Sequence, residues 1–154
     1  MNDWMKIGLG AIVVSKLMGG KSRYGNPQMR CPAPTQDLML NTENRDAAIK
    51  NPRIMYGPLN LSDNKYWQRL AKMWNTTPSV AKDSRCSNCA AFDISPRMDD
   101  CMPGPLSDKD GRLGYCWMHH FKCHSARTCR TWAAGGPITK DSVSYEWQKR
   151  AMKI

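Results

Sequence analysis

Six cysteines between residues 86 and 129 have a spacing that could support metal chemistry. They follow the pattern C-x2-C-x11-C-x14-C-x6-C-x5-C, from Cys86 through Cys89, Cys101, Cys116 and Cys123 to Cys129. A C-x2-C pair in a turn directs two sulfurs at one point, which suits zinc or an iron–sulfur cluster. The intervening Ser87 and Asn88 are small, so their backbone N–H groups can turn towards sulfur and stabilise a thiolate.

Three interpretations of these cysteines follow from the residues alone. A structural zinc ion usually takes its four ligands from two closely spaced pairs, and the sequence has no second C-x2-C pair. A [4Fe–4S] cluster can take ligands from separated loops, but it needs an apolar wrapping to exclude water. An even set in a short stretch is also the usual signature of a disulfide framework. Aromatic residues beside the cysteines could supply the wrapping: Phe92, Tyr115, Trp117, Phe121 and Trp132.

The cysteine region resembles the high-potential iron–sulfur proteins. The resemblance lies in CSNCAAF, in Cys101-Met-Pro-Gly and in Gly114-Tyr115-Cys116-Trp117. It implies a small, irregular, α-rich and loop-rich metal-cluster domain. By motif, the [4Fe–4S] ligands would be Cys86, Cys89, Cys101 and Cys116, and the shielding residues Phe92, Tyr115, Trp117 and Trp132.

The chain departs from that family in its cysteine count. The family's closing pattern, Gly-aromatic-Cys-x2-aromatic, is echoed twice here. Gly114-Tyr115-Cys116 carries its first half and Cys129-Arg-Thr-Trp132 its second. Cys129 and Cys123 are therefore alternate ligands, and zinc is the alternative metal.

A second resemblance concerns the whole molecule. The cysteine region and the upstream YW-x2-LAKMW are similar to proteins of tailed phages, particularly marine and cyanobacterial ones. This resemblance implies a structural protein located in the virion. Its partners would be other virion proteins, reached through an N-terminal helix and arm, and it would take no small-molecule substrate.

The sequence predicts no enzymatic activity. It contains no Walker loop, no H-E-x-x-H and no dinucleotide fingerprint. Cys123 lies near His120 and His124, but clustered cysteines are better explained as ligands than as nucleophiles.

The net charge of +10 attracts nucleic acid, anionic lipid or an acidic protein. Lys and Arg are scattered, however, which equally fits a solvated basic surface. Two further functions stay open: an electron-transfer iron–sulfur protein, and a zinc- or disulfide-stapled module that contacts DNA or membrane.

Composition divides the chain into four segments. Residues 1–20 form an apolar helix that packs on a partner, contacts a membrane or folds back onto its own domain. Residues 21–60 are an extended Pro/Gly-rich arm with a short helix at 42–50 and an incidental free thiol, Cys31. Residues 61–134 are the cluster domain, and 135–154 a helical tail.

Three helices are predicted in the second half of the chain. The first is capped by Ser62 or Asp63 and runs to about Trp74, because its apolar residues recur at helical spacing. A short one spans 78–83. The last is capped by Asp141 or Ser142.

Overall fold

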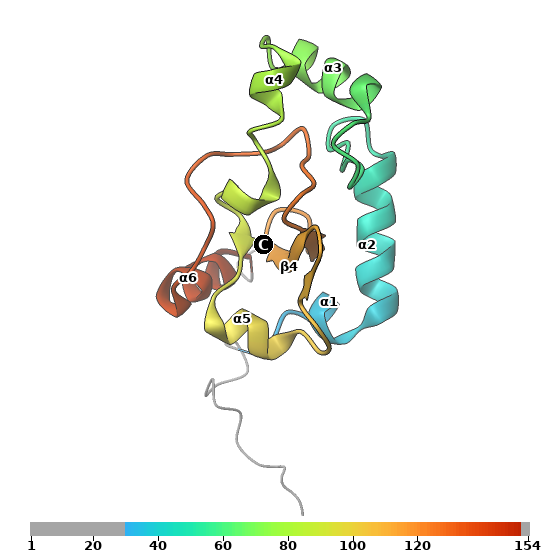
Figure 1. Ribbon diagram of the computed structural model, residues 1–154. Coiled ribbons are helices and arrows are strands. Elements are labelled where there is room, and N and C mark those ends of the chain that lie inside the picture. The colour runs from blue at the N-terminus through green and yellow to red at the C-terminus, as the bar shows by residue number, and fades with distance from the viewer. Residues whose placement is uncertain (1–29, 152–154) are drawn as a thin grey trace, which may run out of the picture. The chain divides into compact units, whose positions relative to one another are not determined.

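The computed structural model describes residues 30–151 (Figure 1). Contacts divide the chain into two units, residues 1–30 and 31–154, and all the elements below belong to the second. No helix in the described range has the length and apolar character needed to cross a membrane. The helix predicted for residues 1–20 and the arm up to residue 29 lie outside the described residues.

Two helices occupy much of the stretch predicted as an extended arm. They are α1 (Ala33–Gln36) and α2 (Leu38–Lys50), and the Asp37 side chain caps α2 by accepting from the Leu40 N–H at 3.0 Å. The helix predicted at 42–50 therefore begins four residues earlier than expected. Its docking is polar: Asn41 Oδ1 accepts from the Lys122 N–H at 2.6 Å, and the Asn44 amide donates to the His120 carbonyl at 2.7 Å.

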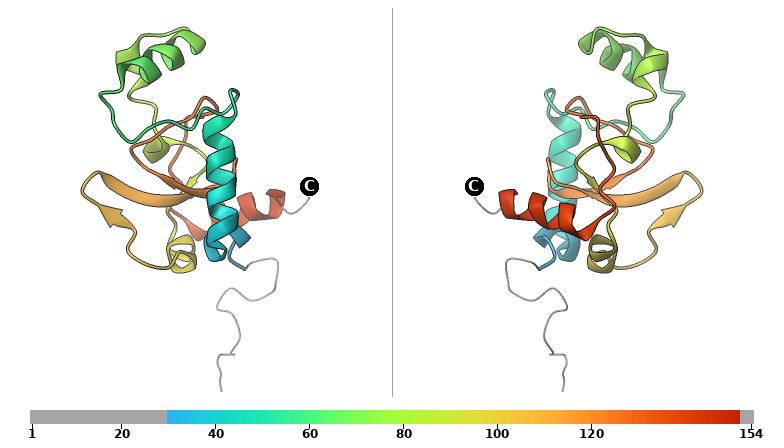
Figure 2. Two further views of the ribbon diagram at one scale, coloured as in Figure 1. Left: turned by 90° about the vertical axis from the view of Figure 1, so that its right-hand side faces the viewer. Right: turned by 90° about the vertical axis from the view of Figure 1, so that its left-hand side faces the viewer.

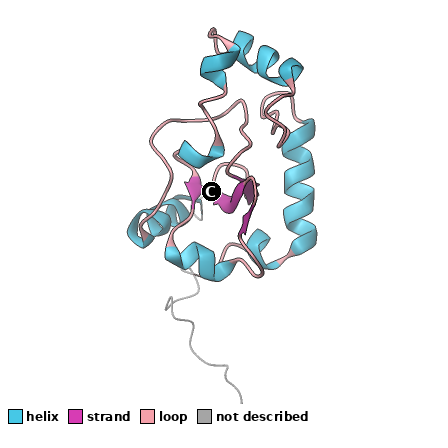
Figure 3. Cartoon of the chain, in the orientation of Figure 1, coloured by secondary structure: helices cyan, strands magenta, loops and turns pink. Residues whose placement is uncertain are grey.

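A small antiparallel sheet, which the sequence analysis did not predict, lies beside α2 (Figures 2 and 3). Its central strand β4 (Gly111–Cys116) pairs with β5 (Phe121–His124) in a hairpin, where Gly114 faces Cys123 and Cys116 faces Phe121. The two-residue strands β2 (Phe92–Asp93) and β3 (Ser107–Asp108) also pair with β4. Two cysteines of the candidate site thus lie on adjacent strands.

The helices α3 (Asn64–Met73) and α4 (Pro78–Ala81) confirm their predictions. Asp63 caps α3, and Thr77 caps α4 with Pro78 at its first position. Their apolar faces meet in a core of fully or almost fully buried residues, namely Trp67, Leu70, Ala71 and Ala81.

The helices α5 (Pro96–Cys101) and α6 (Asp141–Ala151) are joined by a buried polar network. Arg97 donates to Ser144 Oγ at 2.8 Å and to Gln148 Oε1 at 2.6 Å. The Ser144 hydroxyl in turn bonds the Asp93 carboxylate, which also accepts from the Trp117 indole at 2.8 Å. Because Asp93 and Arg97 are almost completely buried, these bonds are needed to offset their desolvation.

Candidate functional site

Five reduced cysteines line one small pocket. The structure leaves Cys86, Cys89, Cys116, Cys123 and Cys129 unpaired. The remaining lining is mostly apolar, from Phe92, Met118, Thr128 and Trp132. The space between them is about 10 Å³, at the lower limit for a single water molecule. The five cysteines therefore line a small, nearly closed space.

The first two cysteines are held by a turn, as their spacing predicted. Cys86 opens the 3₁₀ helix η2 (Cys86–Asn88), and the Cys89 N–H closes it by donating to the Cys86 carbonyl at 3.0 Å. The Cys86 N–H also donates to the Arg127 carbonyl at 2.7 Å. The turn is thereby attached to the loop that leads to Cys129.

A glycine lets another backbone segment approach this turn. A Cβ built on Gly136 would lie 1.7 Å from the Cys89 carbonyl oxygen, so no larger residue fits without moving the backbone. The neighbouring Ala90 N–H donates to the Ala133 carbonyl at 2.8 Å. Segment 133–136 thus covers the turn from outside.

The β4–β5 hairpin supplies two more thiols. Cys116 ends β4, and its carbonyl accepts from the His120 N–H at 2.8 Å, which closes the turn between the strands. Cys123 lies on β5 within hydrogen-bond reach of both Cys116 and Cys86. Its sulfur therefore connects the hairpin to the C-x2-C turn.

Cys129 follows the hairpin in a second short turn. Its carbonyl accepts from the Trp132 N–H at 3.1 Å, and its sulfur lies 3.1 Å from the Thr131 hydroxyl. The alternate ligand of the sequence analysis is thus in the pocket together with Trp132.

Cys101 is not in the pocket, which corrects its assignment as a ligand. It forms a disulfide with Cys31, across a sequence separation of 70 residues. Cys31 is accordingly not the free thiol that was expected. The pairing also differs from a disulfide framework within the six-cysteine stretch, because only Cys101 of that stretch is oxidised.

Backbone N–H groups reach the sulfurs of Cys89, Cys116 and Cys129. Cys89 is a hydrogen-bond partner of the Ala133 and Ala91 backbones, Cys116 of His119 and Met118, and Cys129 of Thr131. Such bonds stabilise the negative charge of a thiolate and are typical of cluster ligands. Cys123 differs, since the hydrogen bonds that act on its sulfur come from the thiols of Cys116 and Cys86.

The thiol pKa values reflect this arrangement. Burial raises the pKa of Cys129 to about 12 against the opposing hydrogen bond from Thr131. Burial also raises the pKa of Cys89, and it raises that of Cys123 well above the ordinary value. The pKa of Cys116 is lowered, chiefly because the Cys123 thiol donates to its sulfur. The hydrogen bond from Cys123 therefore favours the thiolate form of Cys116.

The predicted shielding residues divide into two groups. Phe92 and Trp132 line the pocket itself. Tyr115 and Trp117 form an edge-on aromatic pair with centroids 4.8 Å apart, and both are buried beside it. Burial, with smaller contributions from Cys116 and Cys123, raises the pKa of the Tyr115 phenol.

Three neighbours of the thiols were missed in the sequence analysis. Met118 and Thr128 line the pocket. The pKa of the buried Tyr56 is raised by burial and by the nearby sulfurs of Cys123 and Cys86. Met118 and Thr128 each lie one or two residues from a cysteine, which is a usable signal, whereas Tyr56 is thirty residues away in sequence.

The pocket cysteines fit an iron–sulfur cluster or zinc by their chemistry but not by their present arrangement. As they stand, no three His, Cys, Asp or Glu side chains of the described residues form a group that could hold a metal ion. The donor chemistry nevertheless fits, because soft thiolates select iron–sulfur clusters and zinc. A cluster would require the thiols to rearrange from the positions that they have in this structure.

Comparison with protein-family models, with curated proteins and with solved structures finds no match to this chain.

Proposed function

We propose that the five-thiol pocket holds a [4Fe–4S] cluster that stabilises a non-enzymatic structural protein. The observation that carries this proposal is that five reduced cysteines line one pocket with mostly apolar walls. They come from two turns and from the β4–β5 hairpin. Burial opposes the ionisation of these thiols, and a bound metal cation would offset that cost. A bound metal displaces the thiol protons and makes its binding free energy part of the folding free energy.

The ligands that we propose are Cys86, Cys89, Cys116 and Cys129. The last three have backbone hydrogen bonds at sulfur, and Cys86 shares a turn with Cys89. Cys123 is then a thiol beside the cluster, because its sulfur hydrogen-bonds the thiols of Cys116 and Cys86 and its burial opposes ionisation. The cluster, when bound, supplies four strong metal–sulfur bonds that join the turn, the hairpin and the loop before Trp132.

The test is iron and acid-labile sulfide analysis of the full chain purified without oxygen. About four irons and four sulfides per chain are expected. Cys116→Ser should lose most of the iron, whereas Cys123→Ala should retain it. The Cys31→Ser/Cys101→Ser variant is a matched control for removing cysteines outside the pocket, and it should also retain iron.

Other results would contradict the proposal. One zinc ion per chain would show that the site is a structural zinc site. A metal-free protein with five reactive thiols would show that the pocket holds no metal. If the Cys31→Ser/Cys101→Ser control folds but loses its iron, Cys101 would have to be counted among the cluster ligands.

Location in a virion is a further part of the proposal, and it rests on the resemblance to tailed-phage proteins. Mass spectrometry of purified particles from the phage that encodes the chain should detect it in a fixed ratio to the major structural proteins. Its presence only in the unassembled lysate would contradict that location.

A further inference from the structure

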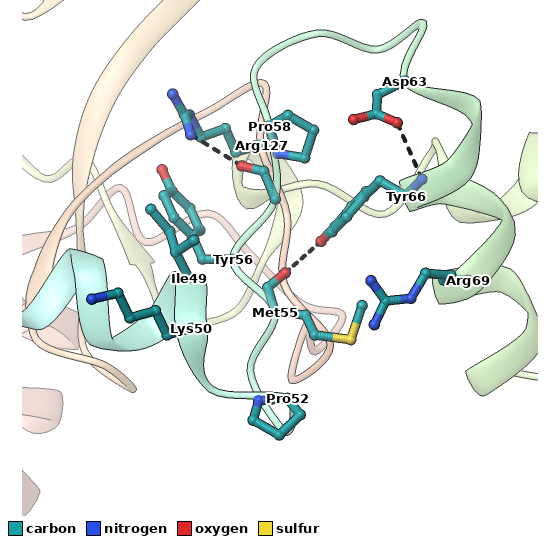
Figure 4. Close-up of a pocket in the computed structure, with 11 residues that line it drawn as sticks. Ile49, Lys50, Pro52, Met55, Tyr56, Pro58, Asp63, Tyr66, Arg69 and Arg127 are labelled. Atoms are coloured by element: carbon teal, nitrogen blue, oxygen red, sulfur yellow. Dashed lines mark hydrogen bonds between the residues drawn. The ribbon is translucent and has the colours of Figure 1, made fainter.

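A second pocket, separate from the cysteine cluster, opens on the surface between α2 and α3 (Figure 4). Its volume is about 450 Å³, within the range of small-molecule sites. The end of α2, the turn at 52–58, the first two turns of α3 and Arg127 form its walls. The pocket therefore joins segments that are far apart in sequence.

The walls of this pocket are fixed by hydrogen bonds. The Tyr66 hydroxyl donates to the Met55 carbonyl at 2.6 Å, and Arg127 donates to the Gly57 carbonyl at 3.1 Å. The Arg127 guanidinium also lies over the Tyr56 ring, 5.3 Å from its centroid. The site is thus largely preformed, which lowers the entropy cost of binding.

The charge of the lining is strongly positive. Lys50, Arg69 and Arg127 line it, against the single carboxylate of Asp63, which is occupied in capping α3. Lys50 and Arg69 are exposed, and among the described residues neither side chain has an ion-pair partner. In Figure 4 Arg69 lies on one side of the pocket, and Lys50 and Arg127 lie on the other.

The remaining lining is apolar. Ile49 is 46% exposed, and Pro52, Pro58 and Met55 contribute further apolar walls. A simple inorganic anion would leave this surface uncovered. The combination of flanking cations and apolar walls instead fits a ligand with an anionic group attached to a ring.

We propose that this pocket binds a nucleotide through its phosphate and base. Phosphate carries up to two negative charges, and guanidinium groups match its oxygens with paired hydrogen bonds. The overall charge of +10 adds a long-range attraction for the same ligand. The nucleotide is either free or one unit of a single strand, and this site is independent of the proposed cluster.

The experiment compares two variants of equal charge on the full chain. Lys50→Gln/Arg69→Gln removes two cations from the pocket. Lys65→Gln/Lys72→Gln removes two exposed cations from α3 outside the pocket. Binding of AMP, of inorganic phosphate and of a twelve-nucleotide oligo(dT) is measured by titration calorimetry at low salt.

We expect the pocket variant to weaken nucleotide binding by about tenfold or more, and the control by about twofold or less. Binding of AMP more tightly than inorganic phosphate would identify a free nucleotide as the ligand, and binding of oligo(dT) alone would identify a strand. If nucleotide binding weakened equally in both variants, the effect would come from the net charge of the protein, and the proposal would be overturned. Absence of AMP and oligo(dT) binding at low salt would overturn it as well.

Discussion

The indole N–H of Trp132 donates to the carbonyl oxygen of Arg85 at 3.0 Å and lies equally close to the Asn88 side-chain oxygen. Arg85 precedes the turn that holds Cys86 and Cys89, and Asn88 lies within it. Trp132 itself lies three residues after Cys129 and lines the cysteine pocket. One side chain therefore fastens the two cysteine-bearing turns together at the edge of the site.

Replacing Trp132 with Phe should loosen this junction. The ring is mostly kept but the donor is lost, so we expect a destabilisation of about 1–3 kcal/mol in urea unfolding. Thiol reactivity of the metal-free protein should also rise. Trp74→Phe is the matched control, since its indole donates to the Arg130 carbonyl at 3.0 Å without lining the cysteine pocket. Equal thiol reactivity in the two variants would argue against a role for Trp132 at the site.

The disulfide between Cys31 and Cys101 should be a major source of stability. It closes a loop across a separation of 70 residues, for which chain entropy predicts about 4 kcal/mol. Cys31→Ser/Cys101→Ser should lower the free energy of unfolding by about that amount. A reductant should destabilise the wild type and leave the variant unchanged. A variant as stable as the oxidised wild type would show that the pair is not formed.

Acid should destabilise the protein through two histidines near the hairpin turn. Burial lowers the pKa of His119, and the neighbouring charge of His120 lowers it slightly further. Burial also lowers the pKa of His120. The unfolded chain then binds more protons than the folded one as pH falls below about 6.5. The stability present above that pH is lost as the pH drops towards the folded values. Melting temperatures of the wild type should therefore fall between pH 7.5 and 5.5, with a smaller fall in His119→Gln. An identical pH dependence in the variant would exclude His119 as a contributor.

Local signals were enough to predict α3, α4 and α6, whereas α5 (Pro96–Cys101) was not predicted. Asp63 before an apolar stripe, Thr77 before Pro78 and Asp141 in the first turn of α6 are start signals that depend on a few neighbouring residues. The start of α2 could not be found by hydrophobic periodicity, because Asn41 and Asn44 dock it through hydrogen bonds to the β4–β5 hairpin. The strands β2 and β3 are only two residues long, too short for an alternating pattern to be visible.

The candidate site was predictable only where its geometry is local. The C-x2-C spacing of Cys86 and Cys89 predicts a turn, because a tight turn reverses the chain over two central residues. Cys101 was misassigned because its partner, Cys31, is distant in sequence, and no local pattern encodes such a pairing. The distinction between Cys123 and its neighbours depends on which backbone N–H groups reach each sulfur, which only the folded chain reveals.

The buried network of Asp93, Arg97, Ser144 and Gln148 bears on how the protein is made. Translation produces Asp93 and Arg97 about fifty residues before Ser144 and Gln148. Until α6 arrives, the carboxylate next to Phe92 lacks the Ser144 hydroxyl, and Arg97 lacks two of its acceptors. The wall of the cysteine pocket that carries Phe92 therefore closes late on the ribosome. This delay leaves an interval in which the thiols on that side of the pocket remain accessible to solvent.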